Sequence, residues 1–153
     1  MIGLMRVEEM EELLRGSQCF AVLGIKPSSR RHLAAYWIPE YMVESGYEII
    51  PVPTRYPDVS EILGRPVVRA LKGAPDLGAA FINVFVRPEA IEPWLPSLKE
   101  TSLPLWFQSG CLSSEAAQEL TAAGVQLAHD CVGCRHAAMV GSASHSTPVV
   151  LGP

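Results

Sequence analysis

The sequence lacks the long apolar segments and the concentrated positive charge that mark several large classes of protein. No apolar run reaches the roughly 18 residues of a membrane-spanning helix, and the apolar start at residues 1–5 is too short for a signal peptide. The 12 Lys and Arg residues are scattered among 16 Asp and Glu residues, so they form no basic face for nucleic acid. We therefore expect a cytoplasmic protein that binds neither a membrane nor nucleic acid.

Cysteine is scarce as well, with four residues in a chain of 153. Small disulfide-rich domains contain far more cysteine, so these four favour a reducing compartment. The length and the 48% of apolar residues suit one domain with a sizeable core. We divide the chain into a leading helix at residues 1–16, an α/β domain at 17–139 and a loosely held extension at 140–153, which is rich in small and polar residues.

Short apolar runs alternate with helical patterns along the chain. Strands are predicted at residues 19–24, 47–52, 78–85, 103–108 and 125–128. Helices are predicted at 6–15, 31–45, 87–99 and 113–123, with a break near Pro39 and a single helical turn at 61–64. This alternation predicts a Rossmann-like, doubly wound α/β fold, with a mostly parallel sheet of five or six strands and helices on both faces. Such sheets bind ligands at the carboxyl ends of their strands.

The segment that joins the first predicted strand to its helix is suited to hold a phosphate. It reads G-I-K-P-S-S-R-R from Gly24, so a glycine opens the turn and serines and arginines follow. Glycine lets a ligand approach the backbone, a helix N-terminus attracts an anion, and Ser or Arg side chains can donate further hydrogen bonds. The turn therefore predicts a phosphate site, and an ordinary strand-to-helix connection is the alternative.

Two features argue against a standard NAD site. Only the first glycine of the G-x-G-x-x-G fingerprint is present, at Gly24. The second predicted strand is not followed by an acidic residue for the ribose diol but leads through P-V-P-T to Arg55. An arginine here indicates an additional phosphate, as in coenzyme A (CoA) or NADP, and a solvent-facing arginine is the alternative.

Six short segments together make the chain resemble a known family. They are VLG with SSR at 22–30, GYEIIPV with RY at 46–56, LG at 63–64, NVFVRPE at 83–89, LWFQSG at 105–110, and AAGV at 122–125 followed by DC and His136. In this order they resemble the small stand-alone CoA-binding proteins of bacteria and archaea. Those proteins are related to the CoA-binding domain of succinyl-CoA synthetase α subunits. The resemblance spans residues 17–139.

The resemblance implies a Rossmann-like fold that binds CoA or an acyl-CoA. It implies that residues 24–30 hold the pyrophosphate, that 52–55 lie near the adenosine end, and that the strand ends at 85–87 and 108–110 line the ligand. The residues predicted to bind CoA are Gly24, Ile25, Lys26, Ser28, Ser29, Arg30, Val52, Pro53, Arg55, Phe85, Arg87, Gln108 and Gly110. The chain departs from the family where Pro53 and Thr54 stand in place of the usual Asn-Pro, which leaves one polar contact to the nucleotide open.

A C-x-x-C pair, Cys131 and Cys134, is followed closely by His136 and suggests zinc binding or thiol exchange. A structural zinc site needs four ligands, and the remaining Cys and His residues show no second paired spacing. A thioredoxin-type pair should open a helix after an early strand, whereas this pair follows the last one. The resembling family carries one cysteine and a histidine here, so Cys134 is extra. We predict packing and hydrogen-bonding roles for this segment, with no bound metal.

The sequence shows no spacing typical of a Ser-His-Asp or Cys-His catalytic arrangement, and its carboxylates form no evident acid–base pair. In the succinyl-CoA synthetase relatives a phosphorylated histidine lies on a separate domain, for which a chain of this length has no room. We therefore predict a non-enzymatic protein that binds CoA or an acyl-CoA and that could serve a protein partner. The alternatives are an NADP-dependent oxidoreductase, and a thiol-redox or metal protein that uses Cys131 and Cys134.

Overall fold

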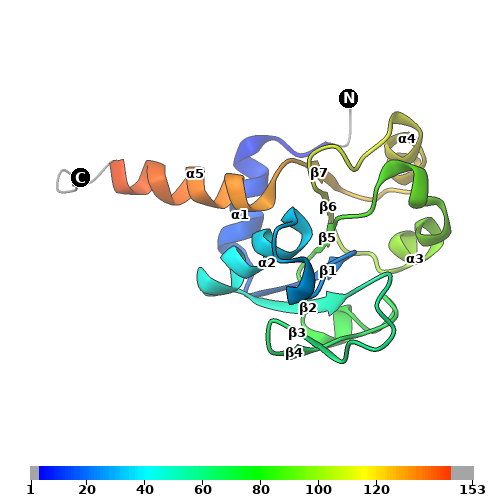
Figure 1. The fold of residues 1–153 in the computed structure, drawn as a ribbon. Coiled ribbons are helices and arrows are strands. Elements are labelled where there is room, and N and C mark those ends of the chain that lie inside the picture. Colours follow the sequence, from blue (N-terminus) through cyan, green and yellow to red (C-terminus); the bar gives the residue numbers. More distant parts are fainter. Residues whose placement is uncertain (1–3, 146–153) are drawn as a thin grey trace.

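The centre of the molecule is a sheet of five parallel strands, which Figure 1 shows nearly edge-on. The computed structural model describes residues 4–145. The strands are β1 (Cys19–Leu23), β2 (Glu48–Val52), β5 (Ile82–Val84), β6 (Leu105–Phe107) and β7 (Leu127–His129), in the order β2-β1-β5-β6-β7. A single parallel bridge between Leu4 and Leu127 continues the sheet beyond β7. Because the chain winds outward from β1 in both directions, the switch point of the sheet lies between β1 and β5.

Helices cover both faces of this sheet. Figure 1 shows α1 (Val7–Gly16), α2 (Ala34–Glu44) and α5 (Val132–His145) on one face, and α3 (Leu95–Glu100) and α4 (Ser114–Ala122) on the other. The predicted Rossmann-like α/β fold is therefore confirmed, with five strands and an entirely parallel main sheet.

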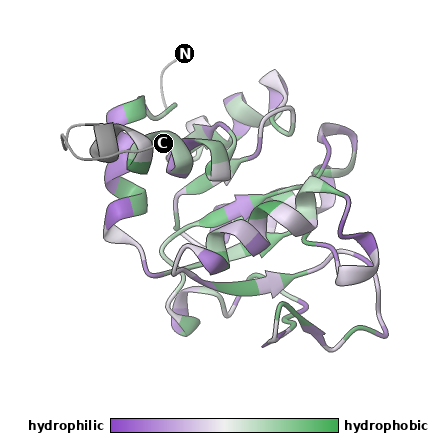
Figure 2. Cartoon of the chain, turned by 60° about the vertical axis from the view of Figure 1, so that its left-hand side comes forward, coloured by the Kyte–Doolittle hydropathy of each residue, from purple (hydrophilic) through white to green (hydrophobic). Residues whose placement is uncertain are grey.

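The central strands are buried on both faces because their alternate side chains enter two separate cores. In β1, Ala21 and Leu23 belong to the core under α3 and α4, while Phe20 and Val22 belong to the core under α1, α2 and α5. Figure 2 shows the consequence, since the strands are mostly green and the purple residues gather on helices and loops. Burial on both faces explains why the strands appear in the sequence as continuous apolar runs rather than alternating ones.

The second helix differs from the prediction at 31–45. A 3-10 turn at Ser28–Arg30 comes first, and α2 then begins at Ala34 and continues through Pro39 without the predicted break. A proline inside a helix leaves the carbonyl four residues earlier, here that of Ala35, without its usual donor. The backbone N–H of Lys26 donates to this carbonyl at 3.1 Å, so the proline costs the helix no unsatisfied acceptor.

The helical turn predicted at 61–64 is wrong. Instead, the strands β3 (Glu61–Ile62) and β4 (Arg65–Pro66) form a small antiparallel hairpin. Its turn consists of Leu63 and Gly64, which have φ values of 54° and 78°. These left-handed values are those of a tight two-residue hairpin turn. Arg65 donates to both carboxylate oxygens of Glu48 at 2.8 and 2.9 Å, which ties the hairpin to β2 and lowers the pKa of Glu48.

Two further segments differ from the predicted elements. The helix predicted at 87–99 begins as two 3-10 turns, Pro88–Ala90 and Glu92–Trp94, before α3 starts. The extension predicted to be loosely held from residue 140 begins as regular structure, because α5 continues to His145. Residues 146–153 of that extension lie outside the described residues. No helix within residues 4–145 is long and apolar enough to cross a membrane.

Candidate functional site

The turn after β1 lies directly against the end of β5. Gly24 has a φ of 87°, and its N–H donates to the carbonyl of Val52 at 2.8 Å. A Cβ atom on Gly24 would lie 3.1 Å from the backbone C and O atoms of Phe85. Any other residue would therefore meet an unfavourable φ and a neighbouring backbone at the same time. Besides suiting a phosphate site, this glycine is required by the packing of two strand ends at the switch point.

The rest of the turn is held by backbone hydrogen bonds rather than by side-chain caps. The bond from Lys26 to Ala35 anchors the turn to the second residue of α2. Neither the 3-10 turn at Ser28–Arg30 nor α2 has a side chain that caps its N-terminus. The ammonium of Lys26 lies 5.9 Å from the ring centroid of Tyr56, so it leans toward the loop after β2.

A hollow of about 300 Å³ opens where β1, β2 and β5 end. Its lining residues are Gly24, Lys26, Thr54, Arg55, Phe85, Val86, Arg87 and Ala90. Among these described residues three carry positive charge and none is a carboxylate. We call this site the basic hollow. Arg87 and Glu89 lie 4.0 Å apart and are both largely exposed, so this weak ion pair leaves Arg87 available to a ligand.

The loop that carries Arg55 is shaped by a residue from another segment. Arg69 donates from its guanidinium to the backbone carbonyls of Arg55, Tyr56, Pro57 and Val59, at distances from 2.6 to 3.3 Å. Tyr56 has a φ of 65°, a left-handed conformation that is uncommon for a bulky side chain. The four hydrogen bonds hold this bend in place and thereby set the position of Arg55.

The structure brings five of the thirteen predicted binding residues to the basic hollow, namely Gly24, Lys26, Arg55, Phe85 and Arg87. Three others, Ile25, Val52 and Pro53, are buried beside it and do not line it. The exposed residues Ser28, Ser29 and Arg30 form the 3-10 turn on the same connection, also outside the lining.

Gln108 and Gly110 follow β6 and lie apart from the basic hollow. Gln108 is buried, and its Oε1 accepts a hydrogen bond from the N–H of Val132 at 3.3 Å. The N–H of Gly110 donates to Nε2 of His129 at 3.3 Å. Gln108 therefore contacts the first residue of α5 and Gly110 the last residue of β7, and their place in a ligand site stays a prediction.

Sequence reasoning missed two residues of this region, Ala90 and Arg69, and did not name two others, Thr54 and Val86, although they lie inside the ranges that it assigned to the ligand. Thr54, Val86 and Ala90 line the hollow, and Arg69 shapes the loop beside it. Thr54 and Val86 lie between or next to predicted residues and could have been included on that ground. Ala90 and Arg69 carry no local signal, because their importance comes from contacts with segments distant in the sequence.

His136 is buried between α2 and α5. Its Nδ1 lies 2.9 Å from the hydroxyl oxygen of Tyr41, and its ring packs edge-on against Tyr41 and Tyr47. Burial lowers the pKa of His136, which favours the neutral ring. These contacts are those of a packing residue that joins two helices.

A parallel sheet wound in both directions from β1, with a basic hollow at its switch point, defines a Rossmann-like nucleotide-binding protein. Within this class, residues 18–137 match the family model of the CoA binding domain, so the chain belongs to the CoA-binding-domain family. The resemblance found in the sequence is confirmed, and CoA is the ligand that membership of this family indicates.

Individual relatives agree with this assignment. The chain is 34% identical over 131 residues to the protein YneT of Bacillus subtilis (strain 168), which covers 84% of this chain and 93% of YneT. The solved structure of a hypothetical protein from Pyrococcus horikoshii OT3 superposes with a TM-score of 0.76 at 25% identity, covering 92% of this chain and 96% of that one. A structure from Thermus thermophilus gives 0.75 at 27% identity, covering 88% and 99%.

Proposed function

We propose that the chain binds CoA or an acyl-CoA with its phosphate groups in the basic hollow, and that this site binds the ligand without catalysing a reaction. The observation that carries this proposal is the grouping of Lys26, Arg55 and Arg87 around Gly24, at the switch point of a CoA-binding-domain family member. The three cations follow three different strands, so only the folded sheet assembles them.

The lining of the hollow suits the chemistry of CoA. The pyrophosphate and the 3′-phosphate are anions, and a hydrogen bond from a charged donor contributes roughly 1.5–3 kcal/mol. Phe85, Val86 and Ala90 add apolar surface beside these charges, which suits the nucleotide or the start of the pantetheine arm. The mixture of cations and apolar wall supports a ligand that carries both phosphate and organic groups.

The lining also supports a binding role without catalysis. The described residues that line the hollow include no histidine, cysteine, tyrosine or carboxylate, the side chains that most often transfer protons or attack a thioester. Tyr56 and Glu89 lie outside the lining, next to Lys26 and Arg87. A protein that presents or senses CoA, with a partner protein as the recipient, fits this composition.

Arg55 allows a test of how the ligand lies. We expect Arg55→Ala to weaken CoA binding about tenfold or more, because a charge-assisted hydrogen bond to the 3′-phosphate is lost. Dephospho-CoA lacks that phosphate, so its affinity should stay nearly unchanged. Isothermal calorimetry measures both ligands, with Arg15→Ala, an exposed arginine on α1, as the matched control. Equal losses for both ligands would show that Arg55 does not contact the 3′-phosphate.

The same calorimeter tests the proposal as a whole. We expect the unsubstituted chain to bind CoA or acetyl-CoA at least tenfold more tightly than NADP or NAD. Tight binding of NADP, with neither heat nor a thermal shift from CoA, would overturn the proposal in favour of a dinucleotide site.

A further inference from the structure

The connection after β7 places two thiols at the start of one helix. Cys131 directly precedes α5, and Cys134 is the third residue of that helix. Helical geometry separates the Cα atoms of such positions by about 5 Å, which lies within the span of a disulfide. In the sequence, this pair is poorly placed for a thioredoxin-type site because it follows the last strand. Such a pair should also open a helix, and in the structure Cys131 and Cys134 stand at the start of α5, a helix of 14 residues.

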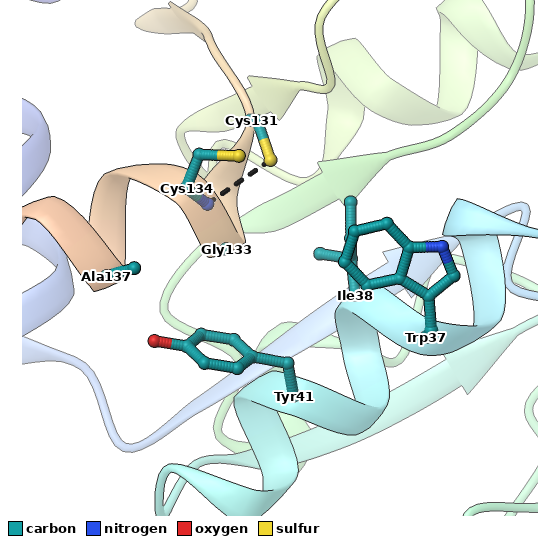
Figure 3. Close-up of a pocket in the computed structure, with 7 residues that line it drawn as sticks. All are labelled: Trp37, Ile38, Tyr41, Cys131, Gly133, Cys134 and Ala137. Carbon is teal, nitrogen blue, oxygen red and sulfur yellow. Dashed lines mark hydrogen bonds between the residues drawn. The ribbon is translucent and has the colours of Figure 1, made fainter.

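The two cysteines are already in contact. The backbone N–H of Cys134 donates to Sγ of Cys131 at 3.2 Å, shown as the dashed line in Figure 3. The hydrogen bond to Cys131 raises the pKa of the Cys134 thiol, so Cys134 holds its proton more tightly. A backbone donor therefore lies beside the sulfur of Cys131, and this geometry supports Cys131 as the attacking thiol of the pair.

An apolar hollow of about 190 Å³ lies beside the two thiols, between α2 and α5. Figure 3 shows its lining residues, which are Trp37, Ile38, Tyr41, Cys131, Gly133, Cys134 and Ala137. A Cβ atom on Gly133 would lie 3.2 Å from Cγ2 of Ile38, so glycine at this position lets the cysteine-bearing turn pack directly on α2. The side chain of Trp37 is 48% exposed and offers an apolar surface to an incoming molecule.

The other cysteines lack these features. Cys19 and Cys111 are half-buried, and burial raises the pKa of both thiols, which makes them poorer nucleophiles. Cys131 is half-buried as well, and Cys134 is exposed. Among the described residues no group of three or more His, Cys, Asp or Glu side chains is placed to hold a metal ion, so the pair is better suited to thiol chemistry.

We propose that Cys131 and Cys134 form a redox-active dithiol that reduces the disulfide of a low-molecular-weight thiol, whose organic part contacts the hollow at Trp37. First, the Cys131 thiolate attacks one sulfur of the small disulfide RSSR. A mixed disulfide forms, the original S–S bond breaks, and RS⁻ leaves and takes a proton from water. Cys134 then loses its proton to solvent and its sulfur attacks Cys131, which expels the second RS⁻. The two cysteines lose two electrons and two protons in total, and RSSR becomes two RSH.

Oxidation of the full-length chain tests this proposal. The reduced protein is mixed with glutathione disulfide or with CoA disulfide, and free thiols and intact mass are followed with time. We expect the thiol count to fall from four to two, and the mass to fall by about 2 Da. Peptide mapping of the unsubstituted chain should assign the new bond to Cys131 and Cys134. Retention of four free thiols with both disulfides, or a bond between other cysteines, would overturn the proposal.

Single variants test the order of the two steps. Cys134→Ser should trap the small thiol on Cys131, whereas Cys131→Ser should form neither the internal disulfide nor an adduct at a comparable rate. Trp37→Ala should slow the first step at least about threefold, and Cys111→Ser, which changes a half-buried thiol outside the pair, should behave as the unsubstituted chain. An adduct that forms equally fast on Cys134 in Cys131→Ser would contradict the assigned nucleophile.

The proposal does not depend on CoA binding at the basic hollow, and the experiment separates the two. The unsubstituted chain should be oxidised by glutathione disulfide, which carries no phosphate group, even if calorimetry shows no binding of CoA. If CoA disulfide oxidises the chain faster than glutathione disulfide does, and if this difference in rate disappears in Arg55→Ala, then CoA is the small thiol whose disulfide the pair reduces. Equal rates with both disulfides would support a general low-molecular-weight thiol couple.

Discussion

The connections after β1 and after β7 start from the same edge of the sheet but use their backbone donors differently. After β7, protein side chains accept these donors, since Asp130 Oδ1 accepts from Cys131 at 2.8 Å, and Gln108 Oε1 accepts from Val132 at 3.3 Å. The sulfur of Cys131 accepts from the N–H of Cys134, the third residue of α5. After β1, by contrast, the 3-10 turn and α2 both begin without a side-chain cap.

The difference shows how one edge of a sheet can support two kinds of chemistry. An uncapped connection beside three cations is suited to an external anion, because no side chain caps the first N–H groups of the 3-10 turn or of α2. At the start of α5, by contrast, side chains of the protein accept hydrogen bonds from the N–H groups of Val132 and Cys134. This helix start offers a ligand the sulfur atoms of Cys131 and Cys134 and the apolar hollow beside them. Both connections follow an apolar strand in the sequence, so the strand pattern does not distinguish them.

Substitution of Gly24 should break the first connection and is expected to have the largest effect. Because of its positive φ and its contact with Phe85, Gly24→Ala should lower the free energy of unfolding by roughly 1–3 kcal/mol and CoA affinity by more than about tenfold. Denaturant unfolding and calorimetry measure the two effects. Gly124→Ala is the matched control, since Gly124 has a φ of 84° but nothing within 4 Å of a Cβ atom. Equal losses of stability in both variants would show that the Phe85 contact adds nothing.

A second prediction concerns the hydrogen bond that holds the turn after β1. Pro39→Ala returns a helical N–H to the carbonyl of Ala35, where it competes with the N–H of Lys26. We expect amide hydrogen exchange at Lys26 to quicken about fivefold, the equivalent of a hydrogen bond of roughly 1 kcal/mol. The control is Pro96→Ala, because Pro96 lies in the first turn of α3, where a missing N–H has no partner within the helix. Unchanged exchange at Lys26 would mean that Ala35 accepts both donors.

The smallest expected effect is a pH dependence of stability that comes from His136 on α5, the helix that follows the second connection. Burial lowers the pKa of His136, so the unfolded chain binds a proton more readily than the folded one. Stability should therefore fall as the pH drops below about 6.5. His136→Gln should remove this part of the pH dependence, measured by thermal unfolding between pH 7.5 and 5 (roughly the range in which histidine titrates). His32→Gln, at an exposed position, should leave the slope unchanged.

Much of the fold and part of the site could be predicted from the sequence. Apolar runs such as 19–24 identified the strands, because strands buried on both faces contain few polar residues. Gly24 and Arg55 were found because each follows a strand at the edge where ligands bind. The hairpin at β3 and β4 was missed, since two-residue strands carry no periodic pattern and depend on the pairing of Arg65 with Glu48.

The sequence by itself determined the fold class and the family, and it located the strand-to-helix turn that opens at Gly24 and the pair Cys131 and Cys134, because all of these depend on residues close together in the chain. Only the tertiary structure decided which residues share a site. Lys26, Arg55 and Arg87 meet in one hollow because parallel strands end at the same edge of the sheet. Arg69 shapes the loop of Arg55, and Trp37 faces Cys131 and Cys134, through contacts between distant segments that no local pattern records.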